Sequence, residues 1–346
     1  MKPHNLFIPF LLLLLLLLAA TAHAANIGVC YGRVADNLPP PPSAVNLLQS
    51  NSISKIRLFN PDPSALSAFS GKADIRLMIG IPNEILPQIA NGTGDSAADW
   101  LTSNIFSHVT PTQVSHLAVG NEILFKDPFY TPHLLPALHN FHGALKKLGL
   151  SDKISISTPH AASVLATSYP PSAGAFVPYI LPVLHPLLRF LAHARAPLMI
   201  NIYPYFTYAA DPVNVPLAYA LFDPSAAVVR DNANGKPYTN MFDATVDAFV
   251  AALEREGFGE LEVVVTETGW PTAGGAGADA EKARRYNGEI VKRVLGGVGT
   301  PRRPSTPVEV YLFGLFDENG KGGEEFERHF GIFHSNGEKA YDISFA

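Results

Sequence analysis

The sequence predicts an α/β protein built as a single (β/α)8 barrel, and three observations support this fold class. Short β-branched or apolar runs recur from one end of the chain to the other, and there are eight of them. Between the runs lie segments whose apolar residues repeat every three or four positions, as on one face of a helix. The runs are almost continuously apolar, which is typical of parallel strands covered by helices. Eight such units in roughly 320 residues match a TIM barrel.

The predicted strands are, in chain order, Asn26–Tyr31, Ser54–Phe59, Ile75–Gly80, Leu117–Gly120, Lys153–Thr158, Pro197–Tyr203, Leu261–Thr266 and Val308–Phe316. Helical spacing is clearest from Leu134 to Leu148, before a C-cap at Gly149. It recurs over residues 242–253 and 280–295. The competing fold is an open doubly wound sheet, which would more often have fewer strands and an early glycine-rich phosphate loop. The glycines of residues 274–277 follow the seventh strand and do not form that motif.

Residues 1–25 have the pattern of a secretory signal peptide, which is cleaved from the mature protein. Lys2 precedes the apolar run Leu11–Leu18, and the small-residue stretch Ala22–Ala24 follows. The segment Lys339–Ala346 is polar and aromatic and lacks the hydrophobic tail of a lipid-anchor signal. We therefore expect a secreted protein without a membrane anchor, extracellular or in a cell wall, with the vacuole as an alternative destination. Residues 26–346 are expected to form a single domain.

The charge pattern argues against a polyanionic partner. The formal net charge is −5, or about −6 once Lys2 is removed with the leader. The basic residues are too few and too dispersed for the stripe that nucleic acid requires. Cys30 is the only cysteine, so the core must hold the domain without internal disulfides. We expect a neutral partner and no nucleic acid.

Other kinds of catalytic site find little support in the sequence. His139 and His142 have helical spacing but no carboxylate nearby, which argues against a metal centre. A serine nucleophile would need a G-x-S-x-G elbow, and the sequence has none. Cys30 lies inside the first predicted strand, where a small buried side chain is favoured over a reactive thiol. We expect no metal and no cofactor.

Two glutamates, Glu122 and Glu267, directly follow the apolar cores of the fourth and seventh predicted strands. The C-terminal ends of barrel strands meet at one face, where the active sites of such barrels lie. Two carboxylates at one barrel mouth suit the cleavage of a glycosidic bond, in which one donates a proton and the other stays ionised. The alternative for each glutamate is a salt bridge or a helix cap at the strand end.

Aromatic residues also gather near the predicted strand ends, and sugar rings present apolar faces that pack on such side chains. They are Tyr31, Phe59, Tyr203, Tyr205, Phe206, Trp270, Phe313 and Phe316. Each alone is better explained as a core residue than as part of a sugar subsite, but the group suggests a groove for a polymer. Asn91 begins the sole N-glycosylation sequon and is a candidate for modification, since it lies in a polar loop.

Together the motifs resemble those of glycoside hydrolase family 17, the plant endo-1,3-β-glucanases. The resemblance spans residues 27–32, 37–39, 57–63, 118–122, 171–176, 201–206, 240–244, 267–271, 316–319 and 330–333. It implies a retaining enzyme that hydrolyses internal 1,3-β-glucosidic linkages of callose, laminarin or fungal wall glucan through a covalent glycosyl intermediate. We also expect a monomer, and we expect no appended carbohydrate-binding module of the kind found in longer members of the family.

The resemblance implies a role for particular residues. Glu122 matches the general acid/base, Glu267 the nucleophile, and Asn121 the residue that binds the hydroxyl next to the reacting carbon. The remaining substrate-binding residues implied by the pattern, or by their place among the rim aromatics, are Tyr31, Tyr203, Phe206, Phe313, Glu318, Lys321 and Glu327. Residues 317–323 depart from the family pattern because glycines replace a proline-containing stretch.

Two other functions remain open at this point. A transglycosylase would form the same covalent intermediate but pass the sugar to another sugar. A catalytically weak glucan-binding protein of the wall or of plant defence would use only the groove, although the presence of both glutamates argues against it.

Overall fold

The computed structural model describes residues 26–346 and contains a barrel of parallel strands. Its strands are β1 (Ile27–Tyr31), β2 (Lys55–Leu58), β3 (Arg76–Ile81), β4 (Val114–Val119), β5 (Ser155–Ser157), β6 (Pro159–Ala161), β9 (Leu198–Asn201), β12 (Val263–Thr268) and β13 (Glu309–Phe313). Their order in the sheet is β5-β4-β3-β2-β1-β13-β12-β9-β6. The segments β5 and β6 are two halves of one strand, interrupted at Thr158, and pair with β4 and β9 respectively. This shared strand closes the ring, so the predicted eight-stranded barrel is confirmed.

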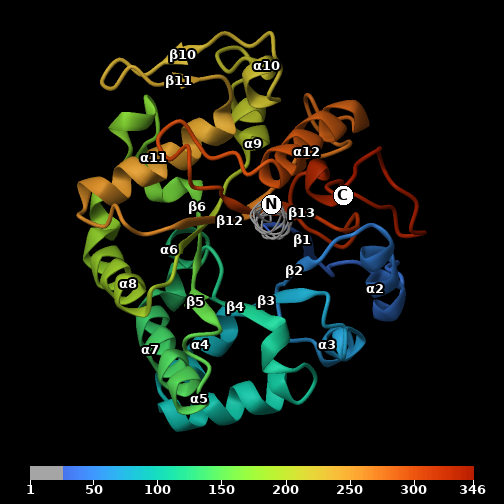
Figure 1. The fold of residues 1–346 in the computed structure, drawn as a ribbon, viewed down its shortest axis with the longest axis vertical. Coiled ribbons are helices and arrows are strands. Elements are labelled where there is room, and N and C mark those ends of the chain that lie inside the picture. Colours follow the sequence, from blue (N-terminus) through green and yellow to red (C-terminus); the bar gives the residue numbers. More distant parts are fainter. Residues whose placement is uncertain (1–25) are drawn as a thin grey trace, which may run out of the picture.

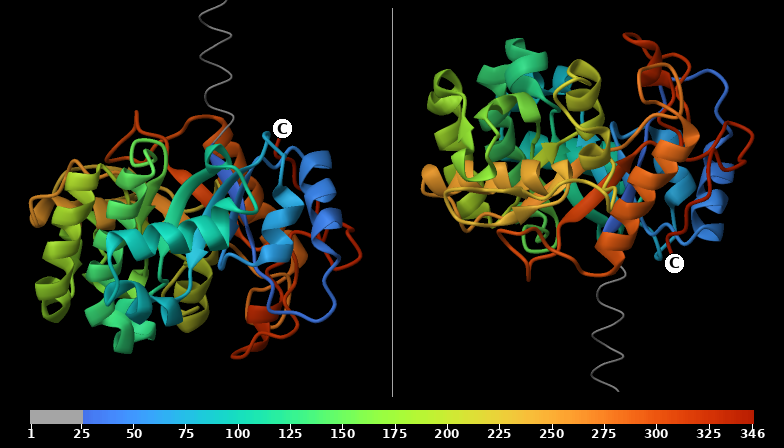
Figure 2. Two further views of the ribbon diagram at one scale, coloured as in Figure 1. Left: turned by 90° about the horizontal axis from the view of Figure 1, so that it is seen from below. Right: turned by 90° about the horizontal axis from the view of Figure 1, so that it is seen from above.

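Most of the helices surround the strands on the outside of the barrel (Figure 1). The helices are α2 (Pro41–Ser50), α3 (Pro63–Phe69), α4 (Leu86–Ala90), α5 (Gly94–Leu101), α6 (Ile123–Lys126), α7 (Thr131–Lys147), α8 (Leu181–Ala194), α9 (Pro204–Ala210), α10 (Leu217–Ala220), α11 (Met241–Arg255) and α12 (Ala280–Leu295). The short helices α6 and α9 follow the ends of β4 and β9. The two side views show helices flanking the strands on both sides (Figure 2). After β13 the chain forms a short 3-10 helix, Glu325–Arg328, where a regular barrel would have its eighth α-helix.

The helices predicted from apolar spacing are α7, α11 and α12, and all three are confirmed. Each is followed by a glycine with positive φ, Gly149, Gly257 or Gly297, as expected of residues that end a helix in the left-handed region. Some predicted strand ends were wrong. The fourth strand begins at Val114, and the sixth ends at Asn201 because Pro204 starts α9.

Two small antiparallel hairpins were not predicted. Strand β7 (Leu165–Thr167) pairs with β8 (Ala175–Phe176), and β10 (Val229–Arg230) pairs with β11 (Pro237–Tyr238). Both lie in the connections that follow the fifth and sixth barrel strands. Strands of two or three residues are too short to leave an alternating pattern in the sequence.

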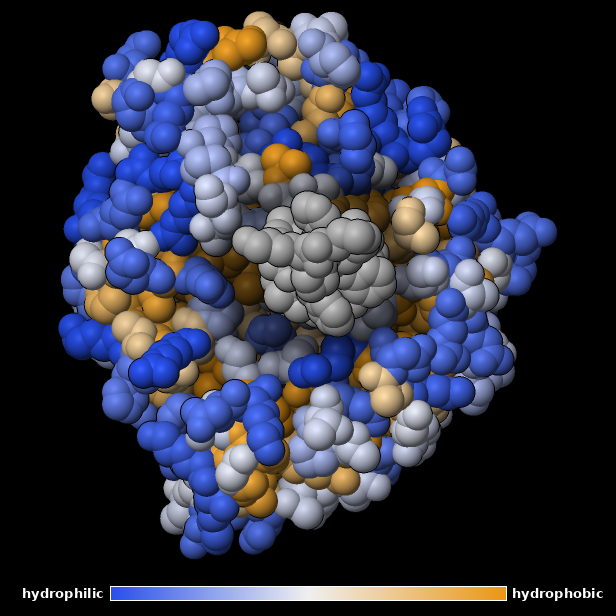
Figure 3. Space-filling view, in the orientation of Figure 1, coloured by the Kyte–Doolittle hydropathy of each residue, from blue (hydrophilic) through white to orange (hydrophobic). Residues whose placement is uncertain are grey.

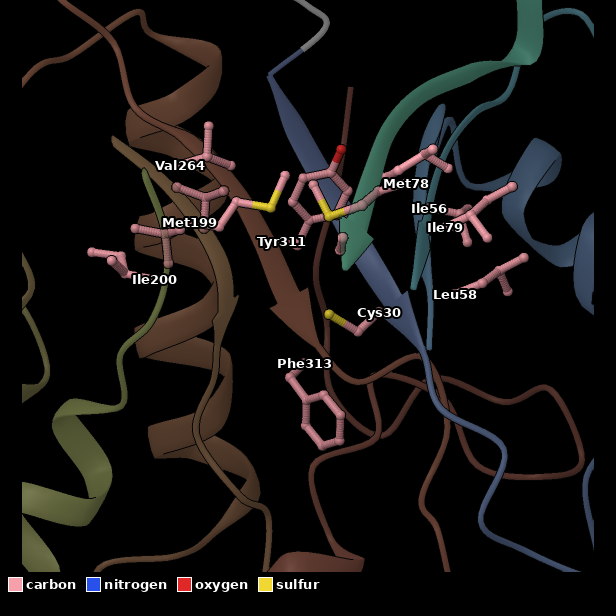
Figure 4. Close-up of a cluster of buried hydrophobic side chains, with 14 of the residues drawn as sticks. Cys30, Ile56, Leu58, Met78, Ile79, Met199, Ile200, Val264, Tyr311 and Phe313 are labelled. Carbon is pink, nitrogen blue, oxygen red and sulfur yellow. The ribbon is translucent and has the colours of Figure 1, made fainter. Parts of the chain in front are cut away.

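The inside of the barrel is filled by side chains from alternate positions of the strands. Cys30, Met78, Met199 and Tyr311 point into the space that the strands enclose, and Phe313 lies further along, where the strands end (Figure 4). Cys30 is aligned with Arg57 of β2, and Arg57 with Met78 of β3. The guanidinium of Arg57 therefore enters the same interior, and this residue is only 1% exposed.

Figure 3 shows that hydrophilic side chains cover most of the periphery of the face seen in Figure 1, with hydrophobic side chains scattered between them. Within residues 26–346, none of the helices combines the length and the apolar character needed to cross a membrane. The signal peptide expected over residues 1–25 lies outside the described residues.

Candidate active site

A cavity of about 380 Å³ lies at the C-terminal ends of the barrel strands. Its lining consists of Tyr31, Gly32, Arg33, Val34, Phe59, Asn60, Asn121, Glu122, Lys126, Tyr203, Phe206, Glu267, Phe313, Glu318, Lys321 and Glu327. All ten residues proposed above as catalytic or substrate-binding are among them. Three of the predicted rim aromatics are not: Tyr205, Trp270 and Phe316 are buried side chains of the core. The structure thus divides the aromatic group into five that face the cavity and three that pack behind it.

Glu122 is presented by a tight turn between β4 and α6. Gly120 and Glu122 both have positive φ, 69° and 52°. A positive φ is uncommon for a glutamate and marks a locally strained backbone at Glu122. The turn is held from two sides. The backbone N–H of Asn121 donates to Oδ1 of Asn83 at 2.8 Å, and that of Glu122 donates to the carbonyl of Pro159 in β6 at 2.9 Å. Glu122 is 6% exposed, and these two hydrogen bonds fix its position at the ends of the neighbouring strands.

Glu267 is presented by an irregularity in β12. The pairing register of β12 shifts after Val265 against both β9 and β13. In a regular strand, neighbouring side chains point to opposite faces. Here Thr266 and Glu267 both reach the side chain of Asn201, through bonds of 2.7 Å and 3.0 Å. The irregularity therefore turns the Glu267 carboxylate into the cavity, a use of strand bulges that is common beside active sites.

Asn201, the last residue of β9, connects the two glutamates. Its Nδ2 atom donates to Oε1 of Glu122 at 2.9 Å and to Oε1 of Glu267 at 3.0 Å. Since both oxygens bond to one nitrogen, they lie no more than about 6 Å apart, whereas inverting glycosidases separate their carboxyl groups by roughly 6.5–9.5 Å. Asn201 is 2% exposed, and Oγ1 of Thr266 donates to its Oδ1. The Arg57 guanidinium, which can only donate, lies 3.4 Å from the same Oδ1 atom, and this contact indicates which end of the amide carries the donors.

Arg57 forms the buried cationic centre of the site. Its Nη1 atom lies 2.7 Å from Oε1 of Glu267, and Nη2 donates to Oδ1 of Asn121 at 2.8 Å. The guanidinium also donates to the carbonyl of Thr266 at 2.9 Å and lies 4.6 Å from the ring centre of Phe59. A buried arginine without such partners would be costly, so this network both pays for its burial and orients Asn121 and Glu267.

Tyr203 contacts Glu267 from the other side, donating from Oη to Oε2 at 2.8 Å. Burial and the charge of Glu267 raise the pKa of Tyr203 well above its usual value, so the hydroxyl remains a donor at any ordinary pH. The ring of Tyr203 stacks on Phe206 at 4.6 Å and meets Phe313 edge to face. Glu267 therefore accepts hydrogen bonds from an arginine, an asparagine and a tyrosine.

The charged cluster Glu318, Lys321 and Glu327 lies at the edge of the cavity. Oε1 of Glu318 accepts from the backbone N–H of Val34 at 2.8 Å, and Lys321 lies 3.5 Å from its Oε2. The Lys321 ammonium is 4.0 Å from Glu327 and 3.9 Å from the ring centre of Phe313. A cation over an aromatic face is attracted to it. The glycine-rich segment thus still brings these three residues to the cavity.

Three residues of this site were not predicted to have a role: Arg57, Asn201 and Lys126. Each carried a signal that could have been used. Arg57 is a charge within an apolar strand, which is expensive unless it is paired. Asn201 ends a strand, and Lys126 follows Glu122 at a spacing of four, where helical side chains meet. Their partners, however, lie on other strands, and the sequence alone does not identify them.

The chain is similar to known proteins over almost its whole length. The model of the family described as "Glycosyl hydrolases family 17" matches residues 27–345. The chain is 42% identical over 328 residues to a glucan endo-1,3-beta-glucosidase of Vitis vinifera. The aligned residues make up 94% of this chain and 93% of the relative. It is also similar to the solved structure of CJP38, a beta-1,3-glucanase and allergen of Cryptomeria japonica pollen, with a TM-score of 0.88, 40% identity and coverage of 93% and 99% of the two chains. The similarity to one of two plant beta-glucan endohydrolases with distinct substrate specificities has a TM-score of 0.85, 39% identity and coverage of 92% and 99%.

Proposed function

Because the chain belongs to glycosyl hydrolase family 17, and is thus a glycoside hydrolase of the β-1,3-glucanase family, we propose that it hydrolyses internal 1,3-β-glucosidic linkages with retention of configuration. The observation that carries this proposal is the single amide of Asn201 bonded to both glutamates. The upper limit of about 6 Å on the separation of the two bonded oxygens accommodates the 5–5.5 Å of retaining pairs.

The surroundings of the two carboxylates support different roles for them. Glu267 accepts bonds from Arg57, Asn201 and Tyr203, and these donors stabilise the anion that a nucleophile must be. Glu122 receives one buried amide bond, from Asn201, and its other oxygen contacts only the exposed Lys126. Glu122 thus has one oxygen that is not bonded to the barrel, and a general acid needs such an oxygen to reach the leaving group. We therefore assign Glu122 as the acid/base and Glu267 as the nucleophile.

The reaction then follows in two steps. Glu267 attacks the anomeric carbon while Glu122 donates its proton to the leaving glycosidic oxygen, which gives a covalent glycosyl intermediate. Glu122, now ionised, takes a proton from water, and the resulting hydroxide oxygen displaces Glu267. Arg57 holds Asn121 beside the nucleophile, where its amide can bind the hydroxyl next to the reacting carbon.

A glucan polymer is the substrate that best fits the cavity. The rings of Tyr203, Phe206 and Phe313 provide apolar surfaces for sugar faces, while Glu318 and Glu327 offer acceptors for hydroxyls. Callose, laminarin and fungal wall glucan contain the linkage that the names of the relatives describe. Secretion through residues 1–25, a monomeric state and a single catalytic domain over residues 26–346 remain part of this proposal.

Hydrolysis of laminarin tests the proposal directly. We expect the mature protein to generate new reducing ends at mildly acidic pH, products of several sugar units, and the β anomer as the first-formed end in proton NMR. Glu267→Ala should abolish this activity in a folded protein. A folded wild type that releases no reducing ends would refute the proposal, products longer than the donor would instead indicate a transglycosylase, and laminarin binding without turnover would indicate a glucan-binding protein.

A further inference from the structure

Lys126 contacts the one oxygen of Glu122 that the reaction has to use. The Oε1 atom of Glu122 is bonded to Asn201 within the barrel, whereas Oε2 lies 2.5 Å from the Lys126 ammonium. Oε2 is itself buried, although 72% of the Lys126 side chain is exposed. A general acid must come within about 2.6–3.2 Å of the atom that it protonates. With Oε1 already bonded, Oε2 is the oxygen available to the leaving group.

The ammonium therefore occupies the place that a glycosidic oxygen has to take. Lys126 is the last residue of α6, a helix of four residues that begins directly after Glu122. Its four-carbon stem is flexible and largely in solvent, so the cation can leave without any change in the barrel. Burial works to lower the pKa of Lys126, but the ion pair with Glu122 outweighs this effect and raises the pKa overall. Lys126 thus stays cationic throughout the working range of the protein.

Charged and titratable groups face Glu122 from several other elements, but they are engaged elsewhere. They are Arg57 on β2, Tyr203 after β9, Glu267 on β12, and Lys321 and Glu327 in the C-terminal segment. Arg57 and Tyr203 bond to Glu267, and Lys321 lies between Glu318 and Glu327. Among residues 26–346, Lys126 is the only cation in ion-pair contact with Glu122.

We propose that Lys126 is a positioning residue that covers the acid/base carboxylate in the free protein and is displaced by the leaving-group sugar of a bound glucan. This proposal rests on the proposed function. A cation beside a carboxylate favours its ionised form. Binding of the sugar moves the ammonium from Oε2 to solvent or to sugar hydroxyls. Oε2 then takes up a proton from solvent water, and this proton passes to the glycosidic oxygen. Lys126 itself keeps its proton in both states.

The test compares pH profiles of kcat/KM on laminarin, because kcat/KM reports the ionisation of the free enzyme. Lys126→Met removes the cation but keeps the apolar stem, and it should move the alkaline limb of the profile upward, because the ionised carboxylate loses its cationic partner. Lys126→Arg should keep the limb near that of the wild type. Lys147→Met is the matched control, because Lys147 is an exposed lysine paired with Asp95 at 2.8 Å, on helices that do not line the cavity.

A second substrate separates an effect through Glu122 from a merely structural one. The 2,4-dinitrophenyl glycoside of laminaribiose has a leaving group that needs no proton, so its kcat/KM should be the same for Lys126→Met and wild type within about two-fold. The role of Lys126 would be overturned by any of three results. The alkaline limb does not move in Lys126→Met, it moves equally in Lys147→Met, or Lys126→Met lowers kcat/KM equally on both substrates. A wild type inactive on laminarin would instead overturn the proposed function.

Discussion

Asn201 offers the sharpest test of how the site is held together. Replacing it by leucine keeps the volume of the side chain but removes the amide that bonds to both glutamates. It also removes the acceptor used by Thr266 and, at 3.4 Å, by Arg57. We expect the barrel to remain folded, because the contacts of Asn201 lie at the strand ends, and the activity to fall because the two carboxylates lose their common anchor.

The size of the effect can be worked out from these bonds. A hydrogen bond to a charged group contributes about 1.5–3 kcal/mol. We take the lower value for each glutamate, because each has another partner. The transition state then loses about 3 kcal/mol of stabilisation, which corresponds to a fall in kcat/KM of roughly 150-fold. Asn201→Asp has the same shape but places a third carboxylate about 3 Å from the other two, and like charges at this distance should reduce activity by at least a further ten-fold.

The assay is kcat/KM on laminarin, with thermal unfolding recorded for each variant. Asn140→Leu is a suitable control, because the Asn140 amide also donates two hydrogen bonds, to the carbonyls of Ile89 and Gly92, away from the cavity. This control should lose some stability and keep its activity. A folded Asn201→Leu variant that retains activity within about three-fold of wild type would show that this amide does not hold the two carboxylates.

Three further predictions concern single residues. Tyr203→Phe removes one bond to Glu267 and should lower kcat/KM on laminarin by about ten-fold; an unchanged value would show that the hydroxyl is dispensable. His160 is 1% exposed with neither ring nitrogen bonded, and burial lowers its pKa to about 4. Neutral His160 therefore makes its full contribution to the free energy of unfolding above about pH 6.5. This contribution is lost as the pH falls through about 4, and the loss reaches up to about 3 kcal/mol. Urea unfolding of His160→Leu should show correspondingly less dependence on pH over this range, and an identical dependence would contradict it. Asn91 is exposed at the end of α4, so protein secreted from a eukaryotic host should lose one glycan mass on amidase treatment, and Asn91→Gln should not.

Much of the fold was predictable from local pattern. Parallel barrel strands are buried on both faces, so each leaves an apolar run that is visible without knowledge of its neighbours. The helices α7, α11 and α12 were predictable because one face of each packs on the barrel and each ends before a glycine. The split of the fifth strand at Thr158 was not predictable, since it arises from pairing with β4 on one side and β9 on the other.

For the candidate site, the sequence by itself determined that two carboxylates and a group of aromatic residues meet at one end of the barrel, because the C-terminal ends of parallel strands converge there. Only the tertiary structure decided which side chains hold them. Arg57 and Glu267 are 210 residues apart, and Asn201 lies 79 residues from Glu122. Contacts over such separations depend on strand register and on the irregularity in β12, and a shift of one residue would turn each of these side chains to the opposite face.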